Sequence, residues 1–337
     1  MRAVVMSEPF DGPDRTRVLD IEVPRPGPGQ VAIDVEYAGL NFLDIMARRG
    51  DPGYAPAWPY VPGLEVVGAI RELAEDVVGL AVGERVVAFT RGGGLAEVAV
   101  ADAALVASLP AAAAPELAAA APLALSSAFL LLNDVARIRA GERLLMHSAA
   151  GGIGSAVAQL APLFEVATAI GTVGRAQKID EARRSGWPHV FARDEELTEA
   201  VGRVAGGAVD VVLDPLGTAM LDPDLDLAAP GGRIVLFGNP AGGKPAPLPP
   251  LPRLIGGNVG IVGFSMSRLT ATAPHRAAAA LRRVLELVAA GQLSVPITTI
   301  ESLDEVREAH QLLAEGRGTG KFVVAVDQSR RVRTRTA

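Results

Sequence analysis

Hydrophobic and polar positions follow two different patterns along the chain. In roughly the first 120 residues the patterned stretches are short, and residues 31–37 (VAIDVEY) alternate apolar with polar side chains. Such alternation is typical of a half-buried strand, and a turn-rich connector with several prolines precedes it at 24–29. Residues 66–70 and 85–89 are further strand candidates. We therefore expect this part of the chain to be rich in β-strands.

From about residue 122 the pattern changes to short apolar runs that alternate with helical segments. Strand candidates lie at 143–147, 168–171, 189–192, 209–213, 233–237 and 259–263. This alternation predicts an α/β fold with a doubly wound, parallel sheet of six strands. Beyond residue 265 we expect a long helix at 274–290, a strand at 294–297, a helix at 303–315 and a final strand at 321–326.

The longest apolar stretch runs from residue 117 to 132. It contains Pro122, Ser126 and Ser127 and ends at Asn133. A helix that crosses a membrane needs about 20 apolar residues. We therefore expect a buried helix that joins two domains, and no association with a membrane.

Composition restricts the function classes. The chain has 337 residues, 49% of them hydrophobic, a formal net charge of −6, four scattered histidines and no cysteine. This length suffices for two domains, and the acidic balance argues against nucleic acid as a main partner. The basic residues at 330–335 are interpreted as a solvated terminus. No secretory signal is recognisable, which favours the cytoplasm, and without thiolates or paired histidines no zinc site is expected.

The most informative motif is 148–154 (SAAGGIG), which follows the apolar run 143–147 and precedes a helical pattern. A glycine turn between a strand and a helix is the context of a dinucleotide-binding site. Gly151 would let the backbone approach a pyrophosphate, Gly154 would let the helix pack against the strand, and the helix N-terminus offers free amides. The first glycine of the usual triplet is Ala149 here. Because small-residue turns also occur without a ligand, both interpretations stay open.

Residues after the next strand distinguish between the two nicotinamide cofactors. An NAD site usually has Asp or Glu about 20 residues after the glycine turn, whereas 170–178 (IGTVGRAQK) contains Arg175 and Lys178 and no carboxylate. Cations and small polar donors suit a 2′-phosphate, so NADPH is favoured. Lys178 is also one of only three lysines in the chain. The alternative is that both cations are solvated loop charges.

Several motifs in a fixed order resemble the medium-chain dehydrogenase/reductase superfamily. They are 39–44 (GLNFLD) with Gly50 and Tyr54, 62–68 (PGLEVVG), the glycine turn, 171–173, 232–239 (GRIVLFGN) and 316–321 (GRGTGK). Within the superfamily the match is to the zinc-independent quinone oxidoreductase (zeta-crystallin-like) branch, which includes polyketide-type enoyl reductases. The resemblance covers nearly the whole chain. It implies a GroES-like, β-rich catalytic domain formed by 1–121 and 265–337 and a Rossmann NADPH-binding domain formed by 122–264.

The resemblance also bears on zinc. Zinc-dependent relatives carry Cys-His-x-Asp and Gly-His-Glu motifs, and the aligned positions here are 41–44 (NFLD) and 63–65 (GLE). The segment 89–97 is too short for a four-cysteine zinc lobe. We therefore expect chemistry without a metal, and we interpret Asp44 and Glu65 as structural hydrogen-bonding residues.

Roles of individual residues are implied by the same resemblance. Asn41 and Ser126 would lie beside the nicotinamide ribose and carboxamide. The other cofactor contacts would be Ala150, Gly151, Gly152, Ile153 and Gly154 at the pyrophosphate, Gly174, Arg175 and Lys178 at the 2′-phosphate, Phe237, Gly238, Asn239, Phe264, Ser265 and Met266 along the nicotinamide, and Arg317 from the C-terminal segment.

Two aromatic positions of the family pattern are changed in this chain. A tyrosine near the adenosine phosphate is Ala192 here, with Arg193 beside it as a further cofactor-binding candidate. An active-site tyrosine of the family is Met46. These changes leave the substrate pocket open.

The implied reaction is hydride transfer from NADPH to a small molecule, either a quinone or an α,β-unsaturated carbonyl compound. The developing oxyanion needs a hydrogen-bond donor. Without zinc we expect Asn41, Tyr54, Tyr60 or a water to provide it, and Tyr54 and Asn41 are the catalytic candidates. Tyr54 can equally be interpreted as a loop residue that packs on Trp58 and Pro59.

Two other functions stay open. One is an enoyl reductase or tailoring enzyme of polyketide-type metabolism, and the other is a non-catalytic, crystallin-like protein that binds NADPH. The strand at 259–263 would be an exposed apolar edge in a monomer. Such edges are usually covered, so we expect a homodimer formed through it.

Overall fold

The computed structural model describes residues 1–193, 196–242 and 244–326, and the basic residues 330–335 lie outside this range. The chain divides into two compact units. Unit 1 comprises Met1–Ser126, Leu269–Gln292 and the residues from Ile297 onward, and unit 2 comprises Ser127–Arg268 and Leu293–Pro296.

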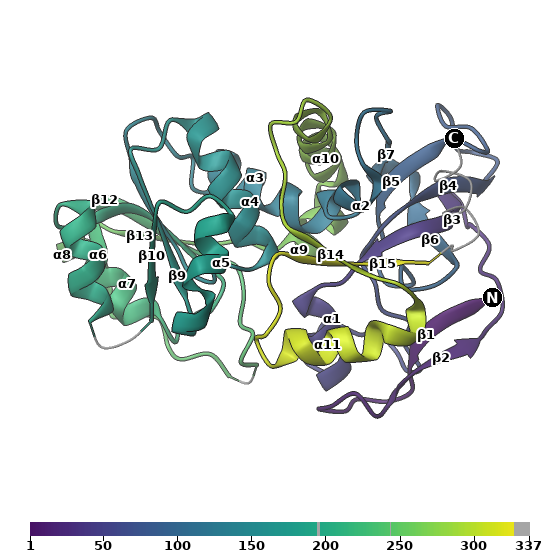
Figure 1. The fold of residues 1–337 in the computed structure, drawn as a ribbon, viewed down its shortest axis with the longest axis horizontal. Helices are drawn as coiled ribbons and strands as arrows, with labels where there is room; N and C mark the ends of the chain where they lie inside the picture. The colour runs from purple at the N-terminus through teal and green to yellow at the C-terminus, as the bar shows by residue number, and fades with distance from the viewer. Residues whose placement is uncertain (194–195, 243, 327–337) are drawn as a thin grey trace. The chain divides into compact units, whose positions relative to one another are not determined.

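Unit 1 is built around a sheet of mostly antiparallel strands (Figure 1). Its strand order is β14-β15-β3-β4-β5-β7, and β6 pairs with β3 beside this path. The strands are β3 (Gln30–Gly39), β4 (Glu65–Leu73), β5 (Arg85–Phe89), β6 (Val98–Asp102), β7 (Val106–Ser108), β14 (Ile297–Ile300) and β15 (Lys321–Ala325). A separate antiparallel pair is formed by β1 (Arg2–Met6) and β2 (Thr16–Asp20). The sheet therefore joins strands from both ends of the chain, because β15 pairs with β3.

The alternating pattern of the sequence accounts for the core of unit 1. Val31, Ile33 and Val35 of β3 pack in one cluster with Val66 and Ile70 of β4. Residues at every second position of a strand point to the same face, so this spacing places the three valine and isoleucine side chains of β3 together. The strands expected at 31–37, 66–70 and 85–89 are confirmed.

The helices of unit 1 come from three separate parts of the chain. They are α1 (Phe42–Arg49), α2 (Pro115–Ala118), α10 (Pro274–Ala289) and α11 (Val306–Ala314). The apolar segment continues from α2 through a wide, π-helical turn (Ala121–Leu125), α3 (Ser126–Leu130) and a second wide turn (Leu131–Val135). Its side chains from 118 to 128 are buried, and the boundary between the units falls within α3.

Unit 2 contains a parallel sheet of six strands with helices on both faces (Figure 1). The strands are β8 (Arg143–Met146), β9 (Thr168–Val173), β10 (His189–Ala192), β11 (Val209–Asp214), β12 (Ala228–Leu236) and β13 (Gly260–Gly263). Their order, β10-β9-β8-β11-β12-β13, is the doubly wound order of a dinucleotide-binding fold. The expected α/β class and all six strands of this sheet are confirmed.

The helices of unit 2 connect these strands. They are α4 (Gly152–Leu160), α5 (Ile179–Arg184), α6 (Leu197–Ala205), α7 (Leu221–Leu227) and α8 (Leu251–Gly257). Helix α9 (Met266–Thr272) follows β13, and the chain passes from unit 2 back to unit 1 within it, after Arg268. In Figure 1, α6, α7 and α8 lie on one side of the sheet and α4 and α5 on the other. Parallel strands connected in this way all end at one edge of the sheet, where such folds bind their ligands.

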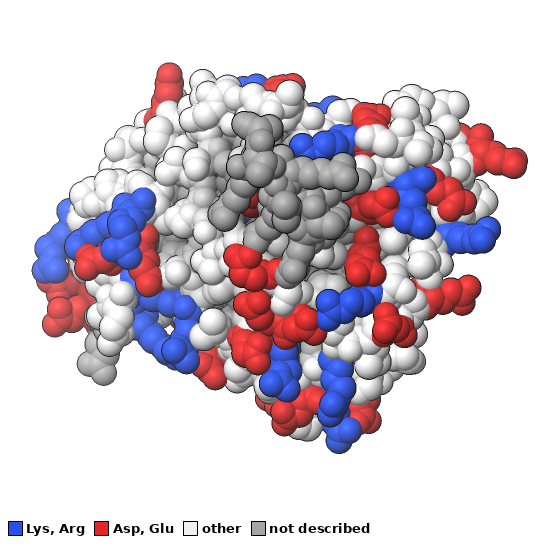
Figure 2. Space-filling view, turned by 45° about the vertical axis from the view of Figure 1, so that its right-hand side comes forward, with Lys and Arg blue, Asp and Glu red and all other residues white. Residues whose placement is uncertain are grey.

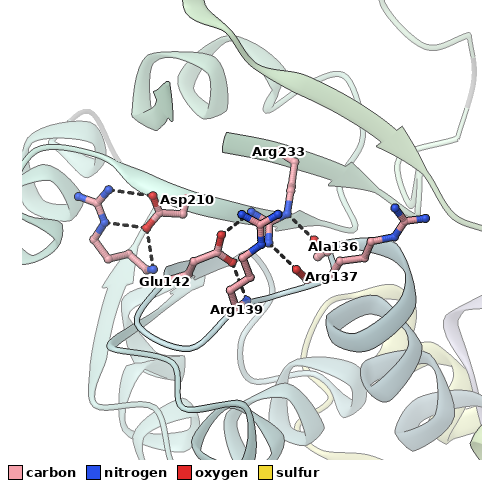
Figure 3. Close-up of polar contacts among 7 residues, drawn as sticks. Ala136, Arg137, Arg139, Glu142, Asp210 and Arg233 are labelled. Atoms are coloured by element: carbon pink, nitrogen blue, oxygen red, sulfur yellow. Dashed lines mark hydrogen bonds and ion pairs between the residues drawn. The ribbon is translucent and has the colours of Figure 1, made fainter. Parts of the chain in front are cut away.

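Ion pairs fix the opposite edge of this sheet (Figure 3). Arg143, at the start of β8, donates two parallel hydrogen bonds of 2.8 and 2.9 Å to the carboxylate of Asp210 in β11. Arg233 of β12 binds Glu142 with bonds of 2.8 and 2.6 Å and donates to the carbonyl of Arg137 at 3.0 Å. Bidentate pairs of this kind are geometrically specific, so they tie β8, β11 and β12 together at this edge.

The largest departure from the sequence-based prediction is at residues 294–297. The strand β14 occupies Ile297–Ile300 instead, and Ile297 is its first residue to pair with β15. Pro296 precedes it and has no N–H to donate to a neighbouring strand. The pairing therefore starts at Ile297, the residue after this proline. The apolar pattern of 294–297 gave the wrong bounds.

Two observations concern the surface. None of the described helices is long and apolar enough to cross a membrane. On the face shown in Figure 2, acidic and basic side chains are interspersed. The described part of that face therefore carries no continuous basic surface of the kind that binds a nucleic-acid backbone.

Candidate functional site

Strand β8 leads directly into the glycine turn at the carboxyl edge of the parallel sheet. Ser148 has a positive φ of 58°, and Gly151 is extended (φ −80°, ψ 172°) immediately before α4. Helix α4 therefore begins at Gly152. The first amides of a helix have no partner within it, and together with the helix dipole they favour an anion at this end.

Close packing explains two small residues of the turn region. A Cβ on Gly154 would lie 2.6 Å from the carbonyl oxygens of Ser148 and Ala149, so only glycine fits. The indole Nε1 of Trp187 donates to the carbonyls of both Ala149 and Gly154 at 3.1 Å. Trp187 is 2% exposed, and a Cβ on Gly171 would lie 2.6 Å from the Cβ of Ala149 and 3.0 Å from the Trp187 ring. Trp187 thus holds the turn in place. The sequence motifs did not reveal this role, and the only signal was that Trp187 is one of two tryptophans in the chain.

Cationic side chains follow the ends of β9 and β10. Arg175 is exposed and Lys178 is half-buried, and burial lowers the pKa of the Lys178 ammonium. Arg193 comes directly after β10, and its Nη2 lies 2.8 Å from the point that a Cβ on Gly174 would occupy. Gly174 therefore leaves space for the guanidinium at the carboxyl end of β9.

The remaining predicted contacts of unit 2 follow β12 and β13. Phe237 N–H donates to the carbonyl of Asp214 at 3.0 Å, and a Cβ on Gly238 would lie 2.2 Å from the carbonyl oxygen of Pro215. Residues 264–266 lead from β13 into α9, where Ser265 Oγ accepts from Arg268 N–H at 3.2 Å. Since both strands belong to the parallel sheet, 237–239 and 264–266 follow its carboxyl edge, as the glycine turn does.

Two predicted contacts of unit 1 have other partners in the structure. Ser126 is fully buried, and its hydroxyl donates to the carbonyl of Ala121 at 2.7 Å across the wide turn. Arg317 lies on the surface, where its guanidinium pairs with Glu315 at 3.1 Å. Their roles toward a cofactor stay predictions.

A buried charged cluster surrounds Asn41 in unit 1. Asn41 Nδ2 donates to Glu65 Oε1 at 2.8 Å and to the carbonyl of Gly39 at 3.3 Å, while Asn41 Oδ1 accepts from Lys321 Nζ. Lys321 Nζ also lies 2.5 Å from Glu65 Oε1, and the two side chains are 4% and 0% exposed. Glu65 Oε2 accepts from the backbone N–H of Leu123 at 2.8 Å. Glu65 is thus held by hydrogen bonds, and both N–H groups of the Asn41 amide are engaged.

Beneath this cluster lies a second buried acid. Asp44 accepts from the N–H of Asn41 at 2.8 Å and from the N–H of Gly63 at 3.1 Å, so it closes the start of α1. Burial raises its pKa to about 6. His310 of α11 is fully buried with Nε2 3.8 Å from Asp44 Oδ2, and burial followed by the charge of Arg48 lowers its pKa to about 3. His310 is therefore neutral at pH 7.

Tyr54 packs in a small apolar cluster with Met6, Ala47, Trp58 and Tyr60. The rings of Trp58 and Tyr60 meet edge to face at 6.3 Å. Burial raises the pKa of the Tyr54 hydroxyl above its ordinary value of 10.0. The hydroxyl therefore stays protonated at neutral pH and able to donate a hydrogen bond.

Comparison with known proteins gives matches along both units. Residues 27–111 match the family model for the alcohol dehydrogenase GroES-like domain, and residues 185–324 match the model named zinc-binding dehydrogenase. The human synaptic vesicle membrane protein VAT-1 homolog-like is 31% identical over 98% of this chain and 82% of its own length.

The chain belongs to the medium-chain dehydrogenase/reductase superfamily.

Solved structures place it among the zinc-independent members of the superfamily. The Escherichia coli quinone oxidoreductase, which was crystallised with NADPH, is 27% identical, with a TM-score of 0.88 over 96% of this chain and 100% of that one. The polyketide synthase protein NorB of Streptomyces orinoci is 36% identical over 89% of this chain. The chain matches only 13% of that much longer protein.

At the positions where zinc-dependent members of the superfamily carry their metal ligands, the side chains of this chain do not suit zinc. Asn41 offers a carboxamide that is already bonded to Glu65 and Lys321, and Leu64 has no donor atom. Glu65 is paired with an ammonium. Within the described ranges no group of three His, Asp or Glu side chains could hold a metal ion.

Proposed function

We propose that this member of the superfamily is an oxidoreductase that uses NADPH and reduces a quinone or an α,β-unsaturated carbonyl compound. The observation that carries the proposal is the sequence after β9, where Arg175 and Lys178 stand in place of the carboxylate of an NAD site. The glycine turn and the N-terminus of α4 lie at the same edge of the sheet. The quinone oxidoreductase crystallised with NADPH supports the same cofactor.

Residues of unit 2 would hold the cofactor in three parts. The amides that begin α4 would bind the pyrophosphate, Arg175 and Lys178 would bind the 2′-phosphate, and 237–239 with 264–266 would line the nicotinamide. Bound in this way, NADPH would supply the hydride.

Unit 1 would supply the hydrogen bond to the acceptor oxygen. Both N–H groups of Asn41 are engaged by Glu65 and Gly39, which favours a positioning role for this amide. Tyr54 is therefore our candidate donor, since its hydroxyl stays protonated at neutral pH. We expect Tyr54→Phe to lower kcat with little change in the affinity for NADPH.

The cofactor assignment is tested by Arg175→Ala with Lys178→Ala. Charge-assisted hydrogen bonds contribute about 1.5–3 kcal/mol each, and exposure of Arg175 reduces its share. We expect the Kd for NADPH to rise by at least about 30-fold while the Kd for NADH changes by less than about 3-fold. Quenching of tryptophan fluorescence measures both constants.

A matched control removes two arginines elsewhere in unit 2. Arg183 and Arg203 are exposed and pair with neighbouring carboxylates, so Arg183→Ala with Arg203→Ala causes the same loss of charge. This control should leave both dissociation constants unchanged. Equal losses for NADPH and NADH in the Arg175 and Lys178 variant would contradict the 2′-phosphate site.

The acceptor is identified by steady-state turnover with NADPH on a quinone panel and an enone panel. A preference for thioester-linked enoyl substrates would favour the polyketide-type reductase, which the similarity to NorB over 89% of this chain supports. Tight binding of NADPH without turnover on any panel would favour the non-catalytic binding protein.

We also propose that two copies associate through β13. This strand ends the described sheet of unit 2, and Val262 in it is 37% exposed. Pairing of the two edges would cover it. Sedimentation equilibrium should give a dimer that Val262→Lys dissociates.

A further inference from the structure

A series of buried polar side chains runs beneath the carboxyl edge of the parallel sheet in unit 2. His147, directly after β8, has Nδ1 2.6 Å from Thr172 Oγ1 of β9 and Nε2 2.7 Å from Asp224 Oδ1 of α7. All three residues are 0% exposed. At the other end, Arg193 Nη1 lies 3.4 Å from Thr172 Oγ1 and donates to it. Thr172 and His147 therefore connect Arg193 to Asp224.

The direction of these hydrogen bonds follows from the chemistry of the two ends. A guanidinium can only donate, so Thr172 Oγ1 accepts from Arg193. Among the described contacts of the Thr172 hydroxyl, His147 Nδ1 is the acceptor available to its hydrogen. His147 then carries its proton on Nε2 and donates to Asp224. Thr172 and His147 thus each accept one hydrogen bond and donate another. Consecutive hydrogen bonds in such a chain strengthen one another.

The charges around the series favour the same arrangement. A carboxylate that accepts from one nitrogen of an imidazole makes the other nitrogen a better acceptor, so Asp224 strengthens the bond from Thr172 to His147. Asp214, fully buried at the end of β11, attracts the guanidinium of Arg193 and partly opposes the lowering of its pKa by burial. Burial and the charge of Asp224 raise the pKa of Asp214 itself to about 7, so this carboxyl is only partly ionised at neutral pH and its attraction for Arg193 is correspondingly partial.

The position of Arg193 indicates what this hydrogen-bonded series does. Its Nη2 lies 2.8 Å from the point that a Cβ on Gly174 would occupy, at the carboxyl end of β9. This is where a dinucleotide-binding fold places the adenosine ribose, and where an arginine accommodates a 2′-phosphate. Thr172, His147 and Asp224 are fully buried and so have no exposed surface with which to touch a cofactor.

We propose that Thr172, His147 and Asp224 are positioning residues for cofactor selection, which hold the guanidinium of Arg193 where it binds the 2′-phosphate of NADPH. The inference rests on the proposed use of NADPH. A long side chain that is already oriented loses less conformational freedom when it binds an anion. Loss of the series should therefore weaken NADPH and leave NADH, which lacks the phosphate, unaffected.

The deciding experiment removes one hydroxyl. Thr172→Val keeps the size and the β-branch of the side chain and should raise the Kd for NADPH by about 3- to 10-fold, with the Kd for NADH unchanged. Arg193→Ala should have a larger effect of the same kind. In the Arg193→Ala background Thr172→Val should cause no further loss of selectivity, because the series then has nothing to position.

Matched variants separate positioning from stability. Thr172→Ser keeps the hydroxyl and should retain the preference for NADPH, whereas Asp224→Asn should reduce it as Thr172→Val does. Asp222→Asn, on the same helix but exposed and paired with Arg253, should not. If Thr172→Val does not fold, Asp224→Asn and Thr172→Ser still test the inference through the ratio of the two dissociation constants.

Each outcome has a distinct meaning. Losses that are equal for NADPH and NADH, or additive effects of Thr172→Val and Arg193→Ala, would show that the series only stabilises unit 2 and would overturn the inference. If Arg175→Ala with Lys178→Ala abolishes the preference for NADPH while Asp224→Asn and Thr172→Val leave it intact, the inference fails and the proposed function stands. If none of these variants changes the preference, both fail.

Discussion

Replacing Lys321 with methionine should destabilise unit 1, because Glu65 would then be a buried carboxylate without a countercharge. Lys321 Nζ lies 2.5 Å from Glu65 Oε1, and the side chains are 4% and 0% exposed. The other partners of this carboxylate are the neutral amides of Asn41 and Leu123, each at 2.8 Å. Removing one partner of a buried ion pair costs about 3–5 kcal/mol, and we expect Lys321→Met to lower the free energy of unfolding by about that amount.

A second substitution isolates the pairwise contribution. Glu65→Gln alone leaves the Lys321 ammonium buried beside a neutral amide, so it too should be destabilising. Combined with Lys321→Met it leaves no charge in this pair, and the oxygen of the introduced carboxamide can still accept from the N–H of Leu123. Replacing both members of a buried pair is often close to neutral. The double variant should therefore be more stable than the sum of the single effects predicts, by about 2 kcal/mol or more.

The assay is urea unfolding followed by circular dichroism and by tryptophan fluorescence. Trp58 lies in unit 1 and Trp187 in unit 2, so fluorescence reports on both units. Lys244 is exposed, and Lys244→Met is a matched control that should change stability by less than about 0.5 kcal/mol. A stability of Lys321→Met within about 1 kcal/mol of the parent, or strictly additive single effects, would refute the reasoning.

Three further results are expected. Gly154→Ala would bring a Cβ within 2.6 Å of two backbone carbonyl oxygens and should cost about 1–3 kcal/mol with weaker binding of NADPH, whereas Gly256→Ala, which has open space around it, should do neither. Since burial lowers the pKa of His310 to about 3, the folded protein binds fewer protons than the unfolded chain between pH 3 and the ordinary value of 6.5 and loses stability as the pH falls through this window. His310→Gln should reduce that loss by about 2.5 kcal/mol between pH 7 and pH 4.5, measured by urea unfolding, and unchanged pH slopes would contradict the assignment. Exhaustive chelation with EDTA should leave turnover unchanged, and a loss that added zinc restores would argue for a metal.

Local patterns were sufficient for much of the fold. The six strands of the parallel sheet were predicted because each is a short apolar run between helices, and neighbouring elements of this kind pack side by side. The bounds of β14 were wrong because hydrophobicity alone does not show which backbone N–H groups are available for pairing. Pro296 removes one of them.

The polar contacts of the site were harder to predict, because their partners are far apart in the sequence. Lys321 and Asn41 are separated by 280 positions, and Trp187 and the turn carbonyl of Ala149 by 38. Neither pair belongs to a local motif with a fixed spacing. A role could be proposed for Arg175 and Lys178 from the sequence because one supersecondary unit, the strand after the glycine turn, determines their place.

The pairing of β15 with β3 has a consequence for how the protein is made on the ribosome. The sheet of unit 2 has its β13 once Gly263 has been synthesised, whereas β15, which pairs with residues 37–39 of β3, arrives only with residues 321–325. Domains generally fold as units while the chain is still growing. Until nearly the whole chain has emerged, residues 37–39 of β3 therefore lack their strand partner and Glu65 lacks its ammonium partner. A chain that ends before Lys321 would keep the unpaired backbone of β3 and the uncompensated charge of Glu65. Unit 1 can therefore be completed only after β15 has been synthesised.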